Sequence, residues 1–285
     1  MNCCICGTLK NCEPYLNKVF ENTEKIGSLF DNYVIILYYD KSSDNSLQIL
    51  KEYQKKNDKL FFYVNQNLPS TYRTINIATG RNFCLSHIKE NYADYNYFIM
   101  IDMDDVSCKD IELDILKKYL YRDDWDGLSF NTSPKYYDLW ALSLYPYFLS
   151  LYCWEDQDKM SKLIFNNVDE SLKKLKENEL LKCASAFNGF SIYKTENQLK
   201  ENELLKCASA FNWFSIYKTE KFINCSYDGR LRNDLLPFNS ILNINRIIGF
   251  KYKKCYDDCE HRAFHLEAIR KNDAKIRISP EILFR

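Results

Sequence analysis

Two aspartates placed two residues apart, Asp102 and Asp104, come directly after an apolar run at 97–101. Five apolar residues in a row have the length and character of a strand that is buried on both faces. Because side chains alternate along a strand, the two acids at its end point to the same side. Such oxygen ligands suit Mg²⁺ or Mn²⁺, ions that commonly bridge the phosphates of a substrate. A solvated acidic turn explains the same residues, so the pair alone is a weak indication of a metal site.

The elements that would position these acids alternate along the first 131 residues. Apolar runs predict strands at 33–39, 60–64 and 97–101, and we also expect strands at 2–8 and 127–131. Helical periodicity predicts helices at 14–30, from 46 onward, at 77–88 and at 110–121. This alternation predicts a parallel sheet with helices on both faces, because right-handed crossovers connect parallel strands.

Polar residues recur where the predicted strands end. Asp40 and Asp44 follow the second strand, and the carboxyl ends of parallel strands meet at one edge, where open α/β sheets bind ligands. Arg73 and Arg81, near and on the third helix, could reach the same crevice. Two simpler interpretations are a helix cap for 40–46 and a solvated helix face for the arginines.

Aromatic and polar residues occur together after residue 132. Tyr137 and Trp140 flank Asp138 in the segment 136–142. Aromatic faces beside a carboxylate suit sugar rings, which are apolar on their faces and hydroxylated at their edges. An aromatic core cluster would have the same composition.

Residues 175–196 and 199–220 form a nearly identical tandem repeat. Over 22 residues the copies differ only at Gly189 against Trp213. Each copy reads as a helix end followed by a strand, and a single-copy fold has one position for that strand. Gly189 would allow a ligand to approach the backbone closely, which Trp213 would not. The second copy, however, is directly joined to the downstream sequence. The sequence therefore leaves open which copy provides the strand.

The composition is that of a folded protein. Of 285 residues, 46% are hydrophobic and 15% aromatic, which excludes disorder as the dominant state. The formal net charge is zero, so no nucleic-acid partner is expected. No apolar run reaches membrane-spanning length, and the first residues do not resemble a signal peptide. We therefore expect a cytoplasmic protein, and its twelve cysteines are expected to be reduced thiols rather than disulfides or a zinc site.

Taken together, the chain resembles GT-A fold glycosyltransferases, most nearly those of large DNA viruses and more distantly the fungal capsule α-mannosyltransferases. The resemblance covers most of residues 2–266 and depends on five stretches in a fixed order. These are 39–46, 73–82, 102–105, 137–141, and 187–190 followed much later by 259–261. If the relationship is viral, the protein would act in the host cytoplasm or belong to the virion.

The resemblance implies a mostly parallel, GT-A-like α/β sheet flanked by helices. Residues 1–132 would be the nucleotide-sugar-binding half, and residues 133–285, which include the repeat, a smaller acceptor-side α+β half of the same domain. It implies a transferase of the hexosyltransferase type that moves a sugar from a nucleoside-diphosphate sugar to a glycan or another hydroxyl acceptor.

The resemblance also assigns roles to residues of this chain. The residues that would contact the donor are Asp40, Asp44, Arg73, Arg81 and Asp102. Asp102 and Asp104, with His261 as third ligand, would hold Mn²⁺ or Mg²⁺ on the diphosphate and stabilise the leaving group. The acceptor-binding residues would be Tyr137, Trp140, Asn188 and Gly189. Asp138 and Glu260 are candidates for the base that an inverting enzyme requires.

Two other functions remain open at this point. A nucleotidyltransferase could use a similar sheet, although the chain lacks a glycine-rich phosphate loop near its first strand. A catalytically impaired nucleotide- or sugar-binding remnant would share the fold, since fold does not determine function. Retained nucleotide binding without transfer would identify the remnant.

Overall fold

The first half of the chain forms the strands and helices that its apolar pattern predicts. The computed structural model describes residues 1–105, 107–133, 136, 138–144, 149, 151–186, 191–192, 214–236, 246, 249–253 and 255–285. The strands are β1 Asn2–Leu9, β2 Asn32–Tyr39, β3 Leu60–Val64, β4 Tyr97–Asp102 and β5 Gly127–Asn131. The helices are α1 Leu16–Gly27, α2 Ser46–Gln54, α3 Arg73–Asn91 and α4 Leu113–Leu120. The α/β class was thus predicted correctly, and α3 begins one turn earlier than its apolar residues indicated.

The second half adds short strands and two longer helices. Its elements are η1 Leu151–Cys153, α5 Gln157–Lys173, β6 Leu181–Cys183, β7 Ser191–Ile192, β8 Phe214–Lys218, α6 Thr219–Phe222, α8 Glu260–Asn272 and β9 Ile276–Ile282. Among the described residues no helix is both long and apolar enough to cross a membrane.

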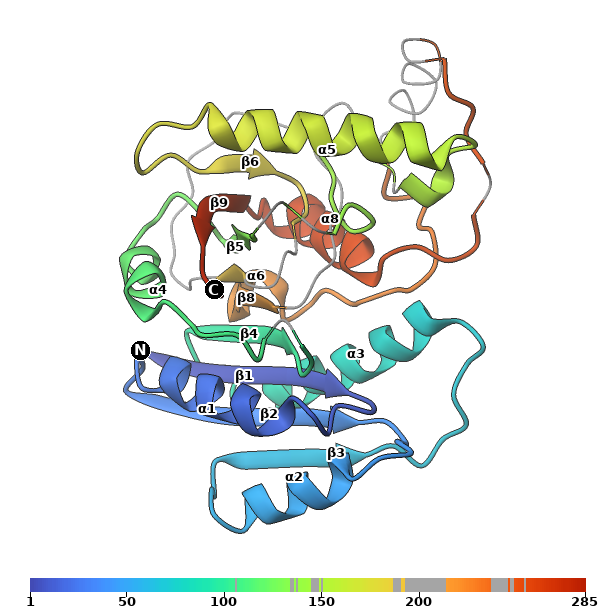
Figure 1. Ribbon diagram of the computed structural model, residues 1–285. Coiled ribbons are helices and arrows are strands. Elements are labelled where there is room, and N and C mark those ends of the chain that lie inside the picture. Colours follow the sequence, from blue (N-terminus) through green and yellow to red (C-terminus); the bar gives the residue numbers. More distant parts are fainter. Residues whose placement is uncertain are drawn as a thin grey trace.

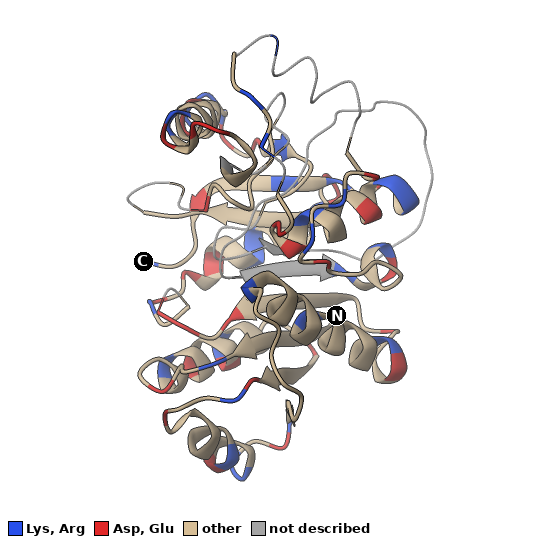
Figure 2. Ribbon diagram, turned by 90° about the vertical axis from the view of Figure 1, so that its right-hand side faces the viewer, with Lys and Arg blue, Asp and Glu red and all other residues tan. Residues whose placement is uncertain are grey.

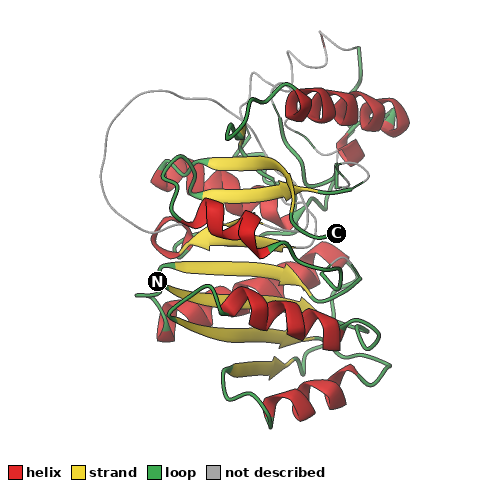
Figure 3. Ribbon diagram, turned by 60° about the vertical axis from the view of Figure 1, so that its left-hand side comes forward, coloured by secondary structure: helices red, strands yellow, loops and turns green. Residues whose placement is uncertain are grey.

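All these strands join in one sheet, in the order β3-β2-β1-β4-β8-β5-β9-β6, with β7 paired to β5 off this path (Figures 1 and 3). The pairs among β3, β2, β1 and β4 are parallel, as predicted. The strand β8 is antiparallel to both β4 and β5, so β5 runs in the direction of β4 without being its neighbour. The succession of neighbouring parallel strands therefore ends at β4.

The two copies of the repeat pair with the same residue of β5. Ile192 of β7 and Ile216 of β8, which are equivalent residues 24 positions apart, are both paired with Leu128. Only β8 also pairs along β4, from Ile101 opposite Phe214 to Tyr97 opposite Lys218. The second copy therefore fills the position between β4 and β5, which the sequence left open.

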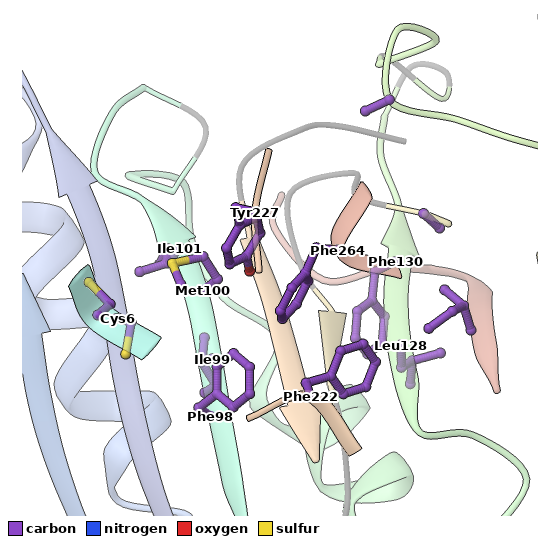
Figure 4. Close-up of a cluster of buried hydrophobic side chains, with 14 of the residues drawn as sticks. Cys6, Phe98, Ile99, Met100, Ile101, Leu128, Phe130, Phe222, Tyr227 and Phe264 are labelled. Atoms are coloured by element: carbon purple, nitrogen blue, oxygen red, sulfur yellow. The ribbon is translucent and has the colours of Figure 1, made fainter. Parts of the chain in front are cut away.

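A continuous apolar core connects the two halves. Side chains of β1, β4 and β5 meet those of the later segments in one cluster (Figure 4). In this cluster, the ring of Phe264 stacks on Tyr227 with a centroid distance of 4.0 Å and lies 5.2 Å from Phe222. Lys, Arg, Asp and Glu are interspersed along the helices and loops, with little charge on the central strands (Figure 2). This core fixes α8 against the sheet and so determines where its first turn lies.

Candidate functional site

The ends of β1, β2 and β4 bring two of the predicted acids to one edge of the sheet. In the register of the parallel strands, Leu9 of β1 lies opposite Tyr39, and Thr8 lies opposite Asp102. Asp40, which follows Tyr39, donates its backbone N–H to Leu9 O at 2.9 Å. The predicted convergence of Asp40 and Asp102 beside the end of β1 is therefore confirmed.

Polar neighbours hold the Asp40 side chain in place. Asn65 Nδ2 donates to its Oδ1 at 3.1 Å, and Lys10 Nζ lies 3.5 Å from its Oδ2. Asp44, by contrast, accepts two backbone N–H groups, that of Ser46 at Oδ1 and that of Glu13 at Oδ2, both at 3.0 Å. The Asp44 carboxylate thus stabilises the start of α2, which is the simpler of its two interpretations.

Arg81 of α3 lies between the acids of β4 and the first turn of α8. It is fully buried, so the solvated-face interpretation was wrong for this residue. Its Nη2 donates to Asp102 Oδ1 at 2.8 Å, and its Nη1 donates to Glu260 Oε1. A guanidinium that serves two carboxylates is held in one orientation, because its donors form a planar fork.

Gly80 allows α3 to approach the sheet at the point where Arg81 must reach inward. A Cβ atom at this position would lie 2.7 Å from Thr8 Cγ2 and 2.7 Å from Tyr38 Cδ1. These contacts are too close for any larger residue, so the glycine is needed for this packing.

His261 is turned toward Arg81 instead of completing a ligand set with the aspartates. It is fully buried, its Nε2 contacts Arg81 Nη1, and its ring lies edge-on to Tyr227 at 5.1 Å. Burial, and then the charge of Arg81, lower the pKa of His261 well below its usual range, so the ring is neutral. Within the described part of the chain, no three His, Cys, Asp or Glu side chains lie close enough together to hold a metal ion. The structure therefore does not bring the predicted trio of ligands together.

Asp104 is a partly buried carboxyl group whose Oδ1 atom is fully buried and which lies close to two other acidic groups. Its Oδ1 has no hydrogen-bond partner. Burial, followed by the charges of Asp102 and Asp105, raises the pKa of Asp104 to about 8, against a smaller opposing effect of Arg73. An added cation would relieve this repulsion and satisfy the oxygen, so the site fits a divalent ion in chemical terms.

The acceptor-side predictions are only partly within the described residues. Asp138 is buried, and its Oδ1 accepts the N–H groups of Trp140 and Ala141 at 2.7 and 3.1 Å. Burial raises the pKa of Asp138 well above its usual range, although these two N–H bonds oppose the shift. The Trp140 ring lies edge-on to Tyr152 at 5.0 Å. The predicted residues Tyr137, Asn188 and Gly189 lie outside the described residues.

Sequence reasoning missed Arg262, which ties α8 to the segment that carries Asp138. Its Nε donates to Asp258 Oδ2 at 2.6 Å and its Nη2 to Trp140 O at 2.7 Å, while Nη1 donates to Ser143. The only signal in the sequence was the spacing of four between Asp258 and Arg262. Arg81 and Arg262 together therefore hold the first turn of α8 between the two halves.

Replacing Arg81 by Met is expected to lower the free energy of unfolding by about 3–5 kcal/mol, because Asp102 and Glu260 would lose their shared counter-charge in a buried place. Denaturant unfolding measures this loss. The matched control is Arg230→Met, since Arg230 has a side chain 59% exposed in its pair with Asp228. That change should cost no more than about 1 kcal/mol, and equal losses in both variants would contradict the assignment.

The family model described as Glycosyl transferase family 2 matches residues 4–154. The chain is similar to TarS 1–349 of S. aureus, with 14% identity and a TM-score of 0.45 over 100% of this chain and 59% of that chain. The same fragment with UDP-GlcNAc shows 19% identity and a TM-score of 0.33 over 47% and 35%.

A third similar structure is the mannosyltransferase PcManGT of Pyrobaculum calidifontis in complex with GDP-Man and Mn²⁺. It shows 11% identity and a TM-score of 0.41, over 79% of this chain and 47% of that one. The chain thus spans about a third to three fifths of the length of these structures. No match was found among curated proteins.

Proposed function

Because the chain belongs to glycosyl transferase family 2, we propose that it transfers a sugar, of the hexose type, from a nucleoside-diphosphate sugar to a hydroxyl group of a glycan or another acceptor. The observation that carries this proposal is the group of carboxylates at the ends of β2 and β4. Residues 1–132 would bind the donor and residues 133–285 the acceptor, with Arg81 and Arg262 connecting the two.

On the donor side, each residue has a distinct task. Asp40 is held by Lys10 and Asn65 at the open edge of the sheet, and we assign it to the base or ribose of the nucleotide. Arg73, which is exposed at the start of α3, would bind the diphosphate. Asp44 would support this edge through the backbone groups that it binds.

Asp102 and Asp104 would hold a Mn²⁺ or Mg²⁺ ion on the diphosphate of the donor. Arg81 binds Oδ1 of Asp102, so we assign Oδ2 of Asp102 and the unsatisfied Oδ1 of Asp104 to the cation. The bound cation would supply charge stabilisation for the departing nucleoside diphosphate. His261 would act on this pair only through Arg81, which it contacts.

Between the two candidate bases, the contacts favour Asp138. Glu260 Oε1 accepts a hydrogen bond from Arg81, so this carboxyl group orients the guanidinium. Asp138 has one oxygen fixed by backbone N–H groups, and its raised pKa brings its proton affinity closer to that of a working base. Trp140, with Tyr137, Asn188 and Gly189, would bind the acceptor.

The proposal is tested by the thermal stability of the protein with a panel of nucleoside diphosphates and their sugars, in Mn²⁺ and in chelator. A ligand that binds only the folded state raises the melting temperature, by an amount that follows from RT ln(1 + [L]/Kd). We expect one nucleoside diphosphate to raise it in Mn²⁺ only. The absence of any shift in a well-folded sample would favour the non-catalytic remnant.

A further inference from the structure

Two cysteines outside the proposed site lie together at a short antiparallel pairing. Trp154, the residue after η1, forms an antiparallel bridge with Tyr252. Beside it, the N–H of Lys253 donates to Cys153 O at 2.6 Å. The thiol of Cys255 in turn donates to the carbonyl oxygen of Tyr152 at 3.0 Å. These contacts place Cys255 next to the backbone of η1.

The two thiol groups are hydrogen-bonded to each other, and they differ in accessibility. Cys153 is fully buried, whereas Cys255 is partly exposed. Their mutual hydrogen bond, and then burial, raise the pKa of Cys153, while the same hydrogen bond lowers the pKa of Cys255. Cys255 thus combines exposure with thiolate character, which are the two properties that make a thiol reactive.

We propose that Cys153 and Cys255 form a reversible disulfide, so that this pair is a site of redox modification. A small-molecule disulfide serves as the oxidant. The Cys255 thiolate attacks one sulfur of the oxidant, which gives a mixed disulfide and releases one small thiolate. Cys153 then loses its proton and attacks Sγ of Cys255, which releases the second small thiolate. Two protein thiols are oxidised, and one small disulfide is reduced to two thiols.

The bond would attach the segment that leads into α8 to η1. It would close a loop between residues 153 and 255, and a crosslink across a long loop restricts the unfolded chain strongly. The oxidised protein should therefore be the more stable form. Oxidation of Cys153 and Cys255 does not depend on sugar transfer by the protein.

The core provides an internal control. Cys6 and Cys84 are also hydrogen-bonded through their thiols, but both are fully buried and both lie among core residues. The thiols are thus in contact in both pairs, but only the pair at η1 has a partly exposed member. A thiol that the oxidant cannot reach stays reduced in the folded protein.

The experiment exposes the folded protein to buffers with set ratios of reduced and oxidised glutathione. The remaining thiols are then alkylated in acid-quenched samples, and the peptides are identified by mass spectrometry. We expect a crosslink between the peptides of Cys153 and Cys255, while Cys6 and Cys84 are alkylated in full. The melting temperature should rise by about 5 °C or more on oxidation and return to its first value with dithiothreitol.

Two variants complete the test. Cys255→Ser should abolish both the crosslink and the rise in melting temperature. Cys108→Ser, which removes the other partly exposed cysteine among the described residues, should leave both unchanged. The proposal is overturned if Cys153 is alkylated in full after oxidation, whether Cys255 is then a free thiol or a stable mixed disulfide with glutathione.

Discussion

Asp104→Asn is expected to abolish metal-dependent donor binding and, at the same time, to stabilise the ligand-free protein above neutral pH. The pKa of Asp104 is about 8, mainly because the group is buried and then because of the charges of Asp102 and Asp105. The carboxyl group therefore opposes folding once it ionises. An asparagine cannot ionise, but it is a poor ligand for a divalent cation. A single substitution should thus move binding and stability in opposite directions.

The sign of the pH dependence follows from proton linkage. In the unfolded chain an aspartate loses its proton near pH 4, and in the folded protein Asp104 keeps it until about pH 8. Between these values the folded state binds more protons, so the free energy of unfolding falls as the pH rises. The slope for one proton is about 1.4 kcal/mol per pH unit. The stabilisation that comes from the raised pKa of Asp104 is fully present below pH 4 and is lost as the pH passes 8.

Denaturant unfolding of the wild type and of Asp104→Asn at several pH values between 5 and 9 measures this slope. The wild type should lose stability across the range more steeply than the variant. Calorimetry with a nucleoside diphosphate and Mn²⁺ measures binding, with Asp105→Asn, at an exposed neighbouring position, as the control that retains it. Equal slopes in the two proteins, or unchanged metal-dependent binding in Asp104→Asn, would contradict the role of Asp104.

The second large effect is an expected difference in sugar transfer between two proteins that each keep only one copy of the repeat. Deletion of residues 190–213 joins Gly189 to Phe214, and deletion of residues 189–212 joins Asn188 to Trp213. Both products keep one intact strand for the position between β4 and β5, so both should fold with nearly wild-type stability. Deletion of residues 197–220 gives the same chain as the first of these.

The two single-copy proteins differ only in glycine against tryptophan, which makes each the control for the other. If the residue at this position approaches the acceptor, transfer from the donor to an acceptor should persist in the glycine form and fall at least tenfold in the tryptophan form. Donor-induced stabilisation should be equal in both. Insoluble protein from both deletions would show instead that the two copies are both integral to the fold.

The sequence predicted the first half well because the information there is local. Apolar runs of five to seven residues define β2, β3 and β4, and the positions of Asp40 and Asp102 at the sheet edge follow from the direction of the strands. The α/β class was inferred from these elements and its GT-A-like arrangement from the family resemblance, and the family match supports both. The predictions that followed from the direction of the parallel strands alone were therefore correct.

The features that the sequence did not predict depend on contacts between distant parts of the chain. Arg81 and Glu260 are 179 residues apart, and helical periodicity does not show which distant residue supplies a counter-charge. The same holds for His261, whose acidic neighbours in sequence suggested a metal ligand although the fold directs it to Arg81. The insertion of β8 was not predictable either, because two identical strand sequences compete for one position and local patterns do not distinguish them.

The pairing of Ile192 and Ile216 with the same residue of β5 also has a genetic consequence. Near-identical units invite slippage during replication, and the loss of one unit of 24 residues preserves the reading frame. If a single copy supports folding, as the deletions are expected to show, the contracted gene would still encode a complete sheet. The longer chain can thus revert to a shorter one in a single event, and selection on the remaining copy would then act on one residue, glycine or tryptophan.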